Sequence, residues 1–267
     1  IGSKPMTGFD IAVLIVVGYH FFPEWLGGGY IGVDVFFVIS GFLISTILFE
    51  NLATGRFSFG DFYGRRIRRI FPALIVVLVT LLVLGWFFFI PEDYEKLGKH
   101  TFAGAVFVSN LVSLSEYSYF DDAAEFKPLL HLWSLGIEEQ FYIVWPVVLW
   151  FGWRLRVSIP LLLATLILVS FGLNVFKSDT DRTFAFFALR TRAWELLLGA
   201  AIGYAAIAWR ARKSSTRAPD MSLLSFGGLT AIAFGCLALN RNSQFPGWWA
   251  LLPVVGADLE VPLVQGG

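Results

Sequence analysis

Apolar runs about 20 residues long are the feature that most limits what this chain can fold into. Residues 30–49, 70–90, 157–176, 193–209 and 221–239 each form such a run. A helix needs about 20 mostly apolar residues to cross the hydrocarbon core of a bilayer. The runs are apolar on every face, whereas the strands of a membrane barrel alternate apolar and polar residues. Helices that span a membrane are therefore predicted.

Four other segments extend this pattern less regularly. Residues 129–153 are long enough to span but contain ionisable side chains, and 9–22 and 101–115 are short. Each short run is either a tilted or thin span or a re-entrant segment. Residues 247–257 begin like a span and stop early. The prediction is an all-α polytopic transmembrane helix bundle with about eight spans and a truncated ninth.

Composition places the chain in the same class. Hydrophobic residues make up 57% and charged residues 15%, against about 25% charged in an average soluble domain. These values exclude a disordered chain and argue strongly against a soluble enzyme. The formal net charge is zero, so no general attraction to nucleic acid is expected. The single cysteine, Cys236, cannot form an internal disulfide.

One domain is expected from this organisation. Residues 1–257 form the membrane-embedded domain, and 258–267 form an atypical tail in which acids, proline and glycines follow the apolar run. We expect the domain to be incomplete at its carboxyl end and the tail to be a truncation scar or an addition.

Arginines before the run at 70–90 predict the orientation. Five arginines precede it, with the acid Asp61 among them: Arg56, Arg65, Arg66, Arg68 and Arg69. Cytoplasmic loops are rich in Lys and Arg, so this loop and the amino terminus are predicted to be cytoplasmic. After residue 100 the charge count is the same whether 101–115 spans or re-enters, so the topology there stays open.

Two ionisable residues near the first runs are candidate catalytic groups. His20 lies near the end of the first apolar run, and Asp34 lies four residues into the second. A histidine can accept a proton near neutral pH, but it can also simply lie at the membrane interface. An acid inside a span is costly and indicates function, although a helix-packing hydrogen bond is the alternative. Asp34 is predicted to orient His20 across the intervening glycines.

The run at 129–153 holds a second group of polar residues. His131, Ser134 and Glu138 have spacings of three and four, which place them on one helical face. We prefer a polar seam lining a cavity to a Ser–His–acid relay. Glu138 and Glu139 are site candidates because two adjacent carboxyls in a span need water or a partner. Trp133 either stacks on a substrate ring or marks the membrane interface, which is the commoner role.

The remaining candidates are basic. Arg65, Arg66, Arg68 and Arg69 are spaced to form pairs on a helix, and they either anchor topology and bind anionic lipid or hold the phosphates of coenzyme A. Arg192 lies three residues before Glu195, so these two either pair with each other or bind substrate. No Walker loop, paired cysteines or His-Glu-x-x-His motif is present, so no metal or tightly bound cofactor is expected.

Five stretches taken together resemble a known family. They are 11–20 (IAVLIVVGYH), 28–45 (GGYIGVDVFFVISGFLIS), 57–73 (FSFGDFYGRRIRRIFPA), 128–146 (PLLHLWSLGIEEQFYIVWP) and 192–199 (RAWELLLG). The chain resembles the acyltransferase 3 family of integral membrane O-acyltransferases over about residues 9–255. Many members acetylate bacterial surface polysaccharides such as lipopolysaccharide O-antigen.

The resemblance implies both a function and a departure from the family pattern. It implies transfer of an acyl group, acetyl above all, from cytoplasmic acyl-CoA to a hydroxyl of a surface glycan or glycolipid, at the bacterial inner membrane. It supports His20 as the general base, helped by Asp34 or Glu138, and arginines 65–69 as the donor site. In the family, an arginine is followed by ten residues and then by the histidine of the first helix. His20 matches this histidine, but the arginine position is occupied by Phe9. A non-enzymatic glycan transporter and an inactive truncated member are the alternatives.

Overall fold

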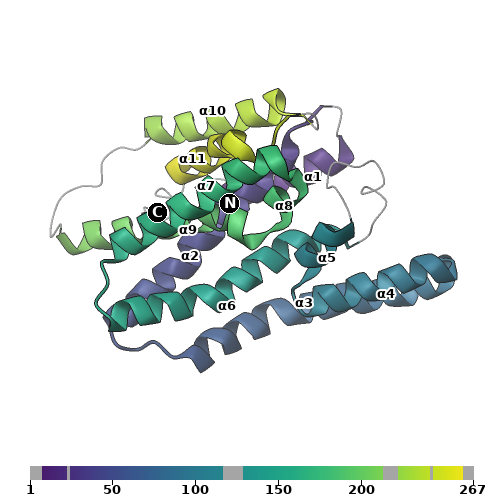
Figure 1. The fold of residues 1–267 in the computed structure, drawn as a ribbon, viewed down its shortest axis with the longest axis horizontal. Coiled ribbons are helices and arrows are strands. Elements are labelled where there is room, and N and C mark those ends of the chain that lie inside the picture. The colour runs from purple at the N-terminus through teal and green to yellow at the C-terminus, as the bar shows by residue number, and fades with distance from the viewer. Residues whose placement is uncertain (1–7, 23–24, 117–128, 213–221, 241–242, 261–267) are drawn as a thin grey trace, which may run out of the picture.

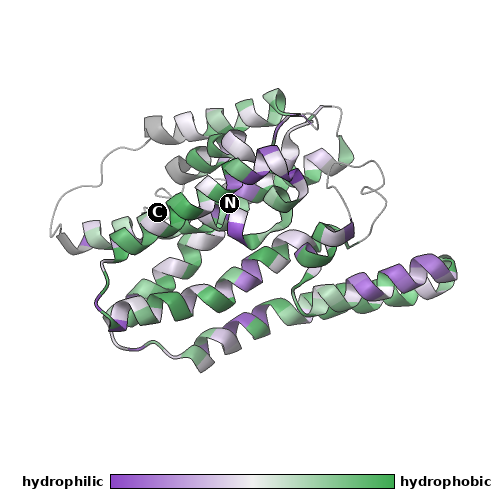
Figure 2. Ribbon diagram, viewed as in Figure 1, coloured by the Kyte–Doolittle hydropathy of each residue, from purple (hydrophilic) through white to green (hydrophobic). Residues whose placement is uncertain are grey.

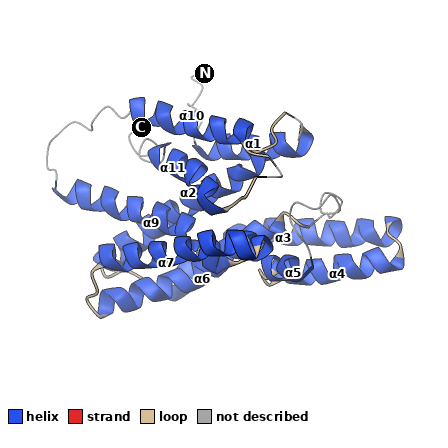
Figure 3. Cartoon of the chain, turned by 45° about the horizontal axis from the view of Figure 1, so that its top comes forward, coloured by secondary structure: helices blue, strands red, loops and turns tan. Residues whose placement is uncertain are grey.

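The computed structural model describes residues 8–22, 25–116, 129–212, 222–240 and 243–260, and these residues form helices and connections without strands (Figures 1 and 3). The side chains of Phe9 and His20, in the first helix, lie outside that description. The elements are α1 (Gly8–Phe21), η1 (Gly29–Ile31), α2 (Gly32–Ala53), α3 (Phe59–Phe88), α4 (Pro91–Ala105), α5 (Ser109–Glu116), α6 (Leu132–Arg154), α7 (Ile159–Thr180), α8 (Arg182–Phe187), α9 (Leu189–Arg212), α10 (Ser222–Ala238), η3 (Gly247–Ala250) and α11 (Leu251–Glu260). The all-α prediction is confirmed for this part of the chain.

Helices α2 and α9 form the centre of the bundle and run in the same direction. Asp34 contacts Arg192 near the start of both helices, and the rings of Phe49 and Tyr204 meet at 5.3 Å further along. The two backbones approach closely because Gly199 lies against α2, where a Cβ at residue 199 would fall 2.8 Å from the Phe42 nitrogen. Small residues allow this kind of close helix pairing in membranes.

Helix α6 runs parallel to α2 as well. The rings of Phe37 and Trp133 lie 6.1 Å apart, and the Trp145 Nε1 donates to Ser45 Oγ at 2.8 Å. The contacts advance together along both helices, so the amino-terminal ends of α2, α6 and α9 share one end of the bundle. Polar residues near the start of these three helices are thereby brought together.

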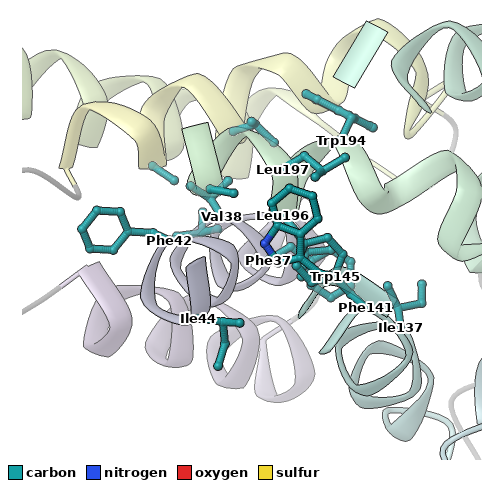
Figure 4. Close-up of a cluster of buried hydrophobic side chains, with 14 of the residues drawn as sticks. Phe37, Val38, Phe42, Ile44, Ile137, Phe141, Trp145, Trp194, Leu196 and Leu197 are labelled. Atoms are coloured by element: carbon teal, nitrogen blue, oxygen red, sulfur yellow. The ribbon is translucent and has the colours of Figure 1, made fainter. Parts of the chain in front are cut away.

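The apolar core fills the space between these three helices. Figure 4 shows Phe37, Val38 and Leu196 meeting Phe141 and Trp145 where α2, α9 and α6 approach one another. The last two rings stack with their centroids 5.7 Å apart. This packing fixes the relative rotation of the helices, and so it fixes which polar side chains face inward.

The outer helices α3 and α7 expose their apolar surface. Only 17% of the most apolar stretch of α3 and 22% of that of α7 is buried. The corresponding share for Gly29–Ala53 is 61%. Figure 2 shows hydrophobic residues along most of α3, while polar residues gather on α4. An apolar surface of this extent suits contact with lipid chains rather than water. These three helices are long and apolar enough to cross a membrane, and the count of eight spans stays a prediction.

Residues 101–115 do not form one continuous helix. Helix α4 ends at Ala105, Phe107 adopts a left-handed φ of 58°, and α5 begins at Ser109. The His100 Nε2 and the Glu116 Oε2 lie 3.0 Å apart, so α5 turns back along α4. The segment is therefore two helices joined by a turn, and whether it spans the membrane or re-enters stays a prediction.

Candidate active site

A fully buried group of three charged side chains joins the starts of α2 and α9. The Arg192 Nη1 lies 3.0 Å from the Asp34 Oδ1 and 2.8 Å from the Glu195 Oε1. All three side chains have zero exposed surface. Burying charges is costly unless they pair, so this group ties the two helices together at one specific register.

Four aromatic rings surround the Arg192 guanidinium. Its Cζ lies 5.5 Å from the ring centre of Phe37, 5.9 Å from Trp133, 5.4 Å from Phe186 and 5.7 Å from Phe245. Aromatic faces attract a cation electrostatically, more strongly where water is excluded. These contacts partly replace the water that the guanidinium loses. Through Phe186 and Phe245, α8 and the segment before η3 pack against the charged group.

A second polar cluster lies on α6. The Glu138 Oε2 accepts hydrogen bonds from Ser40 Oγ at 2.9 Å and from Tyr142 Oη at 3.0 Å. The Arg66 Nη2 donates to Glu139 Oε1 at 3.4 Å, and the Arg66 guanidinium lies 4.0 Å from the Tyr142 ring centre. Three helices, α2, α3 and α6, therefore contribute to this cluster.

The two polar groups are separated along α2 by an aromatic layer. Ser40 follows Asp34 by six positions, which corresponds to about 9 Å of helix rise. Phe37 and Trp133 lie between them with their rings edge to face. The inner surface of the α2–α6–α9 bundle thus carries two separate polar sites.

Only one of the four predicted donor-binding arginines turns toward this inner surface. Arg66 is partly buried, whereas Arg65, Arg68 and Arg69 are exposed. These three lie on other faces of α3 and can contact lipid headgroups or a soluble anion, while Arg66 contacts the acids of α6.

The relay considered for His131, Ser134 and Glu138 does not form among the described contacts. Ser134 Oγ donates to the backbone carbonyl of His131 at 3.2 Å, and Glu138 is engaged by α2 and by Tyr142. His131 is exposed at the start of α6. Trp133 is 2% exposed, so the membrane-interface role is wrong. It is one of the four rings that surround the Arg192 guanidinium.

The predicted pairing of Asp34 with His20 stays a prediction, because the His20 side chain lies outside the described residues. The partner described for Asp34 is Arg192. Nearby, the rings of Tyr19 and Tyr30 lie 5.9 Å apart. The end of α1 that carries His20 therefore lies beside the start of α2, close to the charged group.

Two hydroxyl residues of the site were not predicted from the sequence. Ser40 lies within an apolar run, where an isolated serine ordinarily gives no functional signal. Tyr142 stands four residues after Glu138, a spacing that places both on one helical face. That spacing was an available signal for Tyr142, whereas the Ser40 contact depends entirely on how α2 and α6 pack.

Comparison with known proteins gives consistent matches. A family model described as an acyltransferase domain matches residues 10–257. A putative peptidoglycan O-acetyltransferase, YrhL of Bacillus subtilis, is 36% identical over 242 residues, which cover 85% of this chain and 37% of that protein. The peptidoglycan O-acetyltransferase OatA of Listeria monocytogenes is 35% identical over 235 residues, covering 83% and 36%.

A putative O-acetyltransferase of Staphylococcus aureus (strain MSSA476) is 34% identical over 250 residues, covering 90% of this chain and 41% of that protein. The chain thus spans about two fifths of the length of these curated relatives. No solved structure matches.

Proposed function

Because the chain belongs to the acyltransferase domain family, we propose that it transfers an acetyl group from acyl-CoA to a hydroxyl of a cell-surface glycan. The observation that carries the proposal is the pair of polar sites buried inside an apolar helix bundle. Ionisable groups are rare inside membrane segments and usually mark a substrate or proton pathway. A bundle that needed only to span the bilayer would gain nothing from them.

The arrangement of arginines supports entry of the donor from the cytoplasm. The connections α2–α3 and α6–α7 lie at the same end of the bundle, because α2 runs parallel to α6. They carry Arg56, Arg154 and Arg156, and the start of α3 adds arginines 65–69. The positive-inside rule assigns such an end to the cytoplasm. Helix α1 runs antiparallel to α2, so the amino terminus is proposed to be cytoplasmic as well.

At this end, the arginines on α3 would bind the phosphates of coenzyme A, for which guanidinium groups are well suited. Arg66, the arginine of this group that turns inward, contacts Glu139, the residue next to Glu138. The pantetheine arm, which separates the phosphates from the thioester, would then extend toward the carboxylates of α6. Glu138 would take up a proton during transfer, which is the role of a general base.

At the other end, His20 would deprotonate the acceptor hydroxyl beside the charged group of α2 and α9. Asp34 would support it, held in place by Arg192. Because Arg192 and Glu195 are fully enclosed, we propose that they position Asp34 and the four surrounding rings. Direct contact with the glycan is not assigned to them. The exposed His131 remains a candidate for acceptor contact.

The names of the relatives favour peptidoglycan as the acceptor over the lipopolysaccharide O-antigen that the family resemblance suggested. Two of them are named as peptidoglycan O-acetyltransferases. Both glycans offer sugar hydroxyls at the outer face of the inner membrane, so a direct comparison decides between them.

The test is acetyl-CoA turnover by the purified chain in liposomes, with peptidoglycan fragments or O-antigen supplied as acceptor. We expect release of free CoA with one acceptor, loss of release in His20→Ala and Glu138→Gln, and normal release in Glu92→Gln. Glu92 is exposed on α4 and serves as a matched control. Glycan transport without consumption of acetyl-CoA would instead identify a transporter, and a folded chain without turnover would identify an inactive member. Phe9→Arg tests whether the family's arginine restores activity.

A further inference from the structure

We propose that Glu195 is held as a neutral, protonated acid whose hydroxyl donates a hydrogen bond to Asp34. The inference rests on the proposed function, because it makes Glu195 a positioning residue for the carboxylate that would support His20. Its basis is a mismatch of charges and hydrogen bonds inside the enclosed group of Asp34, Arg192 and Glu195.

The enclosed group contains two acids and one base. Among the described residues, Arg192 is the only cation that contacts either acid. If both acids were ionised, the group would keep an uncompensated negative charge, although all three side chains have zero exposed surface. Burying an unbalanced charge is costly, and an ionisable group in that position usually neutralises instead. One bound proton balances the group.

The hydrogen bonds show the same mismatch. The Arg192 Nη1 donates to Asp34 Oδ1 at 3.0 Å, but Asp34 Oδ2 and both carboxyl oxygens of Glu195 are enclosed and accept no hydrogen bond from the described residues. A carboxylate can only accept hydrogen bonds, whereas a protonated carboxyl also donates one. The two acids touch the same guanidinium nitrogen, so they are neighbours. A proton on one of them therefore supplies the missing donor to the other.

The helix positions indicate which acid keeps the proton. Asp34 lies in the first turn of α2, where the free backbone N–H groups and the helix dipole favour a negative charge. Glu195 lies beyond the first turn of α9, where this effect has faded. Asp34 also accepts the hydrogen bond from Arg192. The negative charge therefore belongs on Asp34 and the proton on Glu195.

The surroundings offer no substitute for the proton. The faces of the four rings around Arg192 carry partial negative charge, so they attract the guanidinium and disfavour a second carboxylate. Arg182, at the start of α8, donates to the backbone carbonyls of Ser243 and Phe245. Its described contacts thus satisfy carbonyl groups, and neither acid of the enclosed group is among them.

A neutral Glu195 defines the role of Asp34. With Arg192 on one oxygen and the Glu195 hydroxyl on the other, the Asp34 carboxylate keeps both its orientation and its charge. A fixed carboxylate beside a histidine stabilises the imidazolium that forms when the histidine takes up a proton. Glu195 would thus act on the acceptor step through Asp34, without touching the glycan.

The first test is infrared spectroscopy of the purified full chain in liposomes, because a protonated carboxyl has a C=O band apart from those of carboxylates and the backbone. We expect Glu195→Gln to lack one such band of the wild type, while Glu92→Gln, an exposed control on α4, keeps them all. Asp34→Asn should lose the same band, because Glu195 then becomes the ionised partner of Arg192. Identical carboxyl bands in the wild type and in Glu195→Gln would show that Glu195 is ionised and would overturn the proposal.

The second test separates positioning from mere packing. Glutamine is neutral and can donate to Asp34, whereas methionine has a similar length and no donor. In the acetyl-CoA assay, kcat of Glu195→Gln should exceed that of Glu195→Met by roughly 10–100-fold, with the same KM for acetyl-CoA. Equal kcat values in the two folded variants would overturn the positioning role.

The outcomes stay distinguishable from those of the proposed function. If Glu195→Met does not fold, the infrared comparison with Glu195→Gln decides alone. A folded wild-type chain that shows the Glu195 band but no turnover would overturn the proposed acyl transfer and leave the protonated Glu195 standing. Turnover without the band would do the reverse.

Discussion

Replacing Arg192 with methionine should destabilise the protein more than any other single change at the site. The guanidinium is the described ionic partner of both Asp34 and Glu195, and all three side chains have zero exposed surface. Arg192→Met keeps a long unbranched side chain but leaves two carboxyls enclosed without their counter-charge. It also removes the contacts with the four surrounding rings.

The expected cost follows from burial. Removing one partner from a buried ionic group typically costs about 3–5 kcal/mol. Each kcal/mol lowers the Tm of a chain of about this length by about 2–4 °C. We therefore expect the Tm of Arg192→Met in detergent to fall by about 6–20 °C. The unfolding can be measured by the fluorescence of the 10 tryptophans.

Two further variants test the reasoning itself. Arg56→Met removes an arginine that is exposed, and such surface changes usually stay within about 0.5 kcal/mol. The triple variant Asp34→Asn, Arg192→Met, Glu195→Gln removes the whole charged group, and most of the lost Tm should return because no unpaired charge remains. If Arg192→Met and Arg56→Met have the same Tm, the charges of Asp34, Arg192 and Glu195 are solvated and the reasoning is refuted.

Three other outcomes are expected. Gly199→Ala should lower the Tm markedly because the new methyl group meets the α2 backbone, while Gly172→Ala, which has open space within 4 Å, should not; equal Tm values would contradict the close packing. Asn110→Ala should cost about 1–3 kcal/mol per buried group left unpaired, measured as a fall in Tm, since Asn110 bonds to α6 and α8 at once; an unchanged Tm would contradict this. Tyr142→Phe should lower kcat in the acetyl-CoA assay with little change in KM, because Glu138 loses one of its two donors; a change in KM alone would place Tyr142 in donor binding instead.

The sequence by itself was sufficient for the class of fold and for most helix positions. The run at 157–176 corresponds to α7 (Ile159–Thr180), and 221–239 corresponds to α10 (Ser222–Ala238). Apolar length is a local property, so it can be read without knowing what packs against it. The same holds for the family motifs, which lie in continuous stretches of the chain.

The break at Phe107 shows where local patterns stop being informative. Residues 101–115 are apolar enough for a short span, yet the chain turns there and α5 returns along α4. Whether such a segment crosses or turns back depends on the partners it meets, here α6 and α8. The sequence left both alternatives open for this reason.

The inner surface of the site was decided only by tertiary structure. Asp34 meets Arg192 across 158 residues, and Ser40 meets Glu138 across 98. Both contacts arise because α2, α6 and α9 run in parallel with one fixed rotation about their axes. Sequence identified which residues are costly to bury, because that cost belongs to each side chain alone. Only the packed helices determined which partner offsets that cost, because a partner is selected by distance in space and not by spacing along the chain.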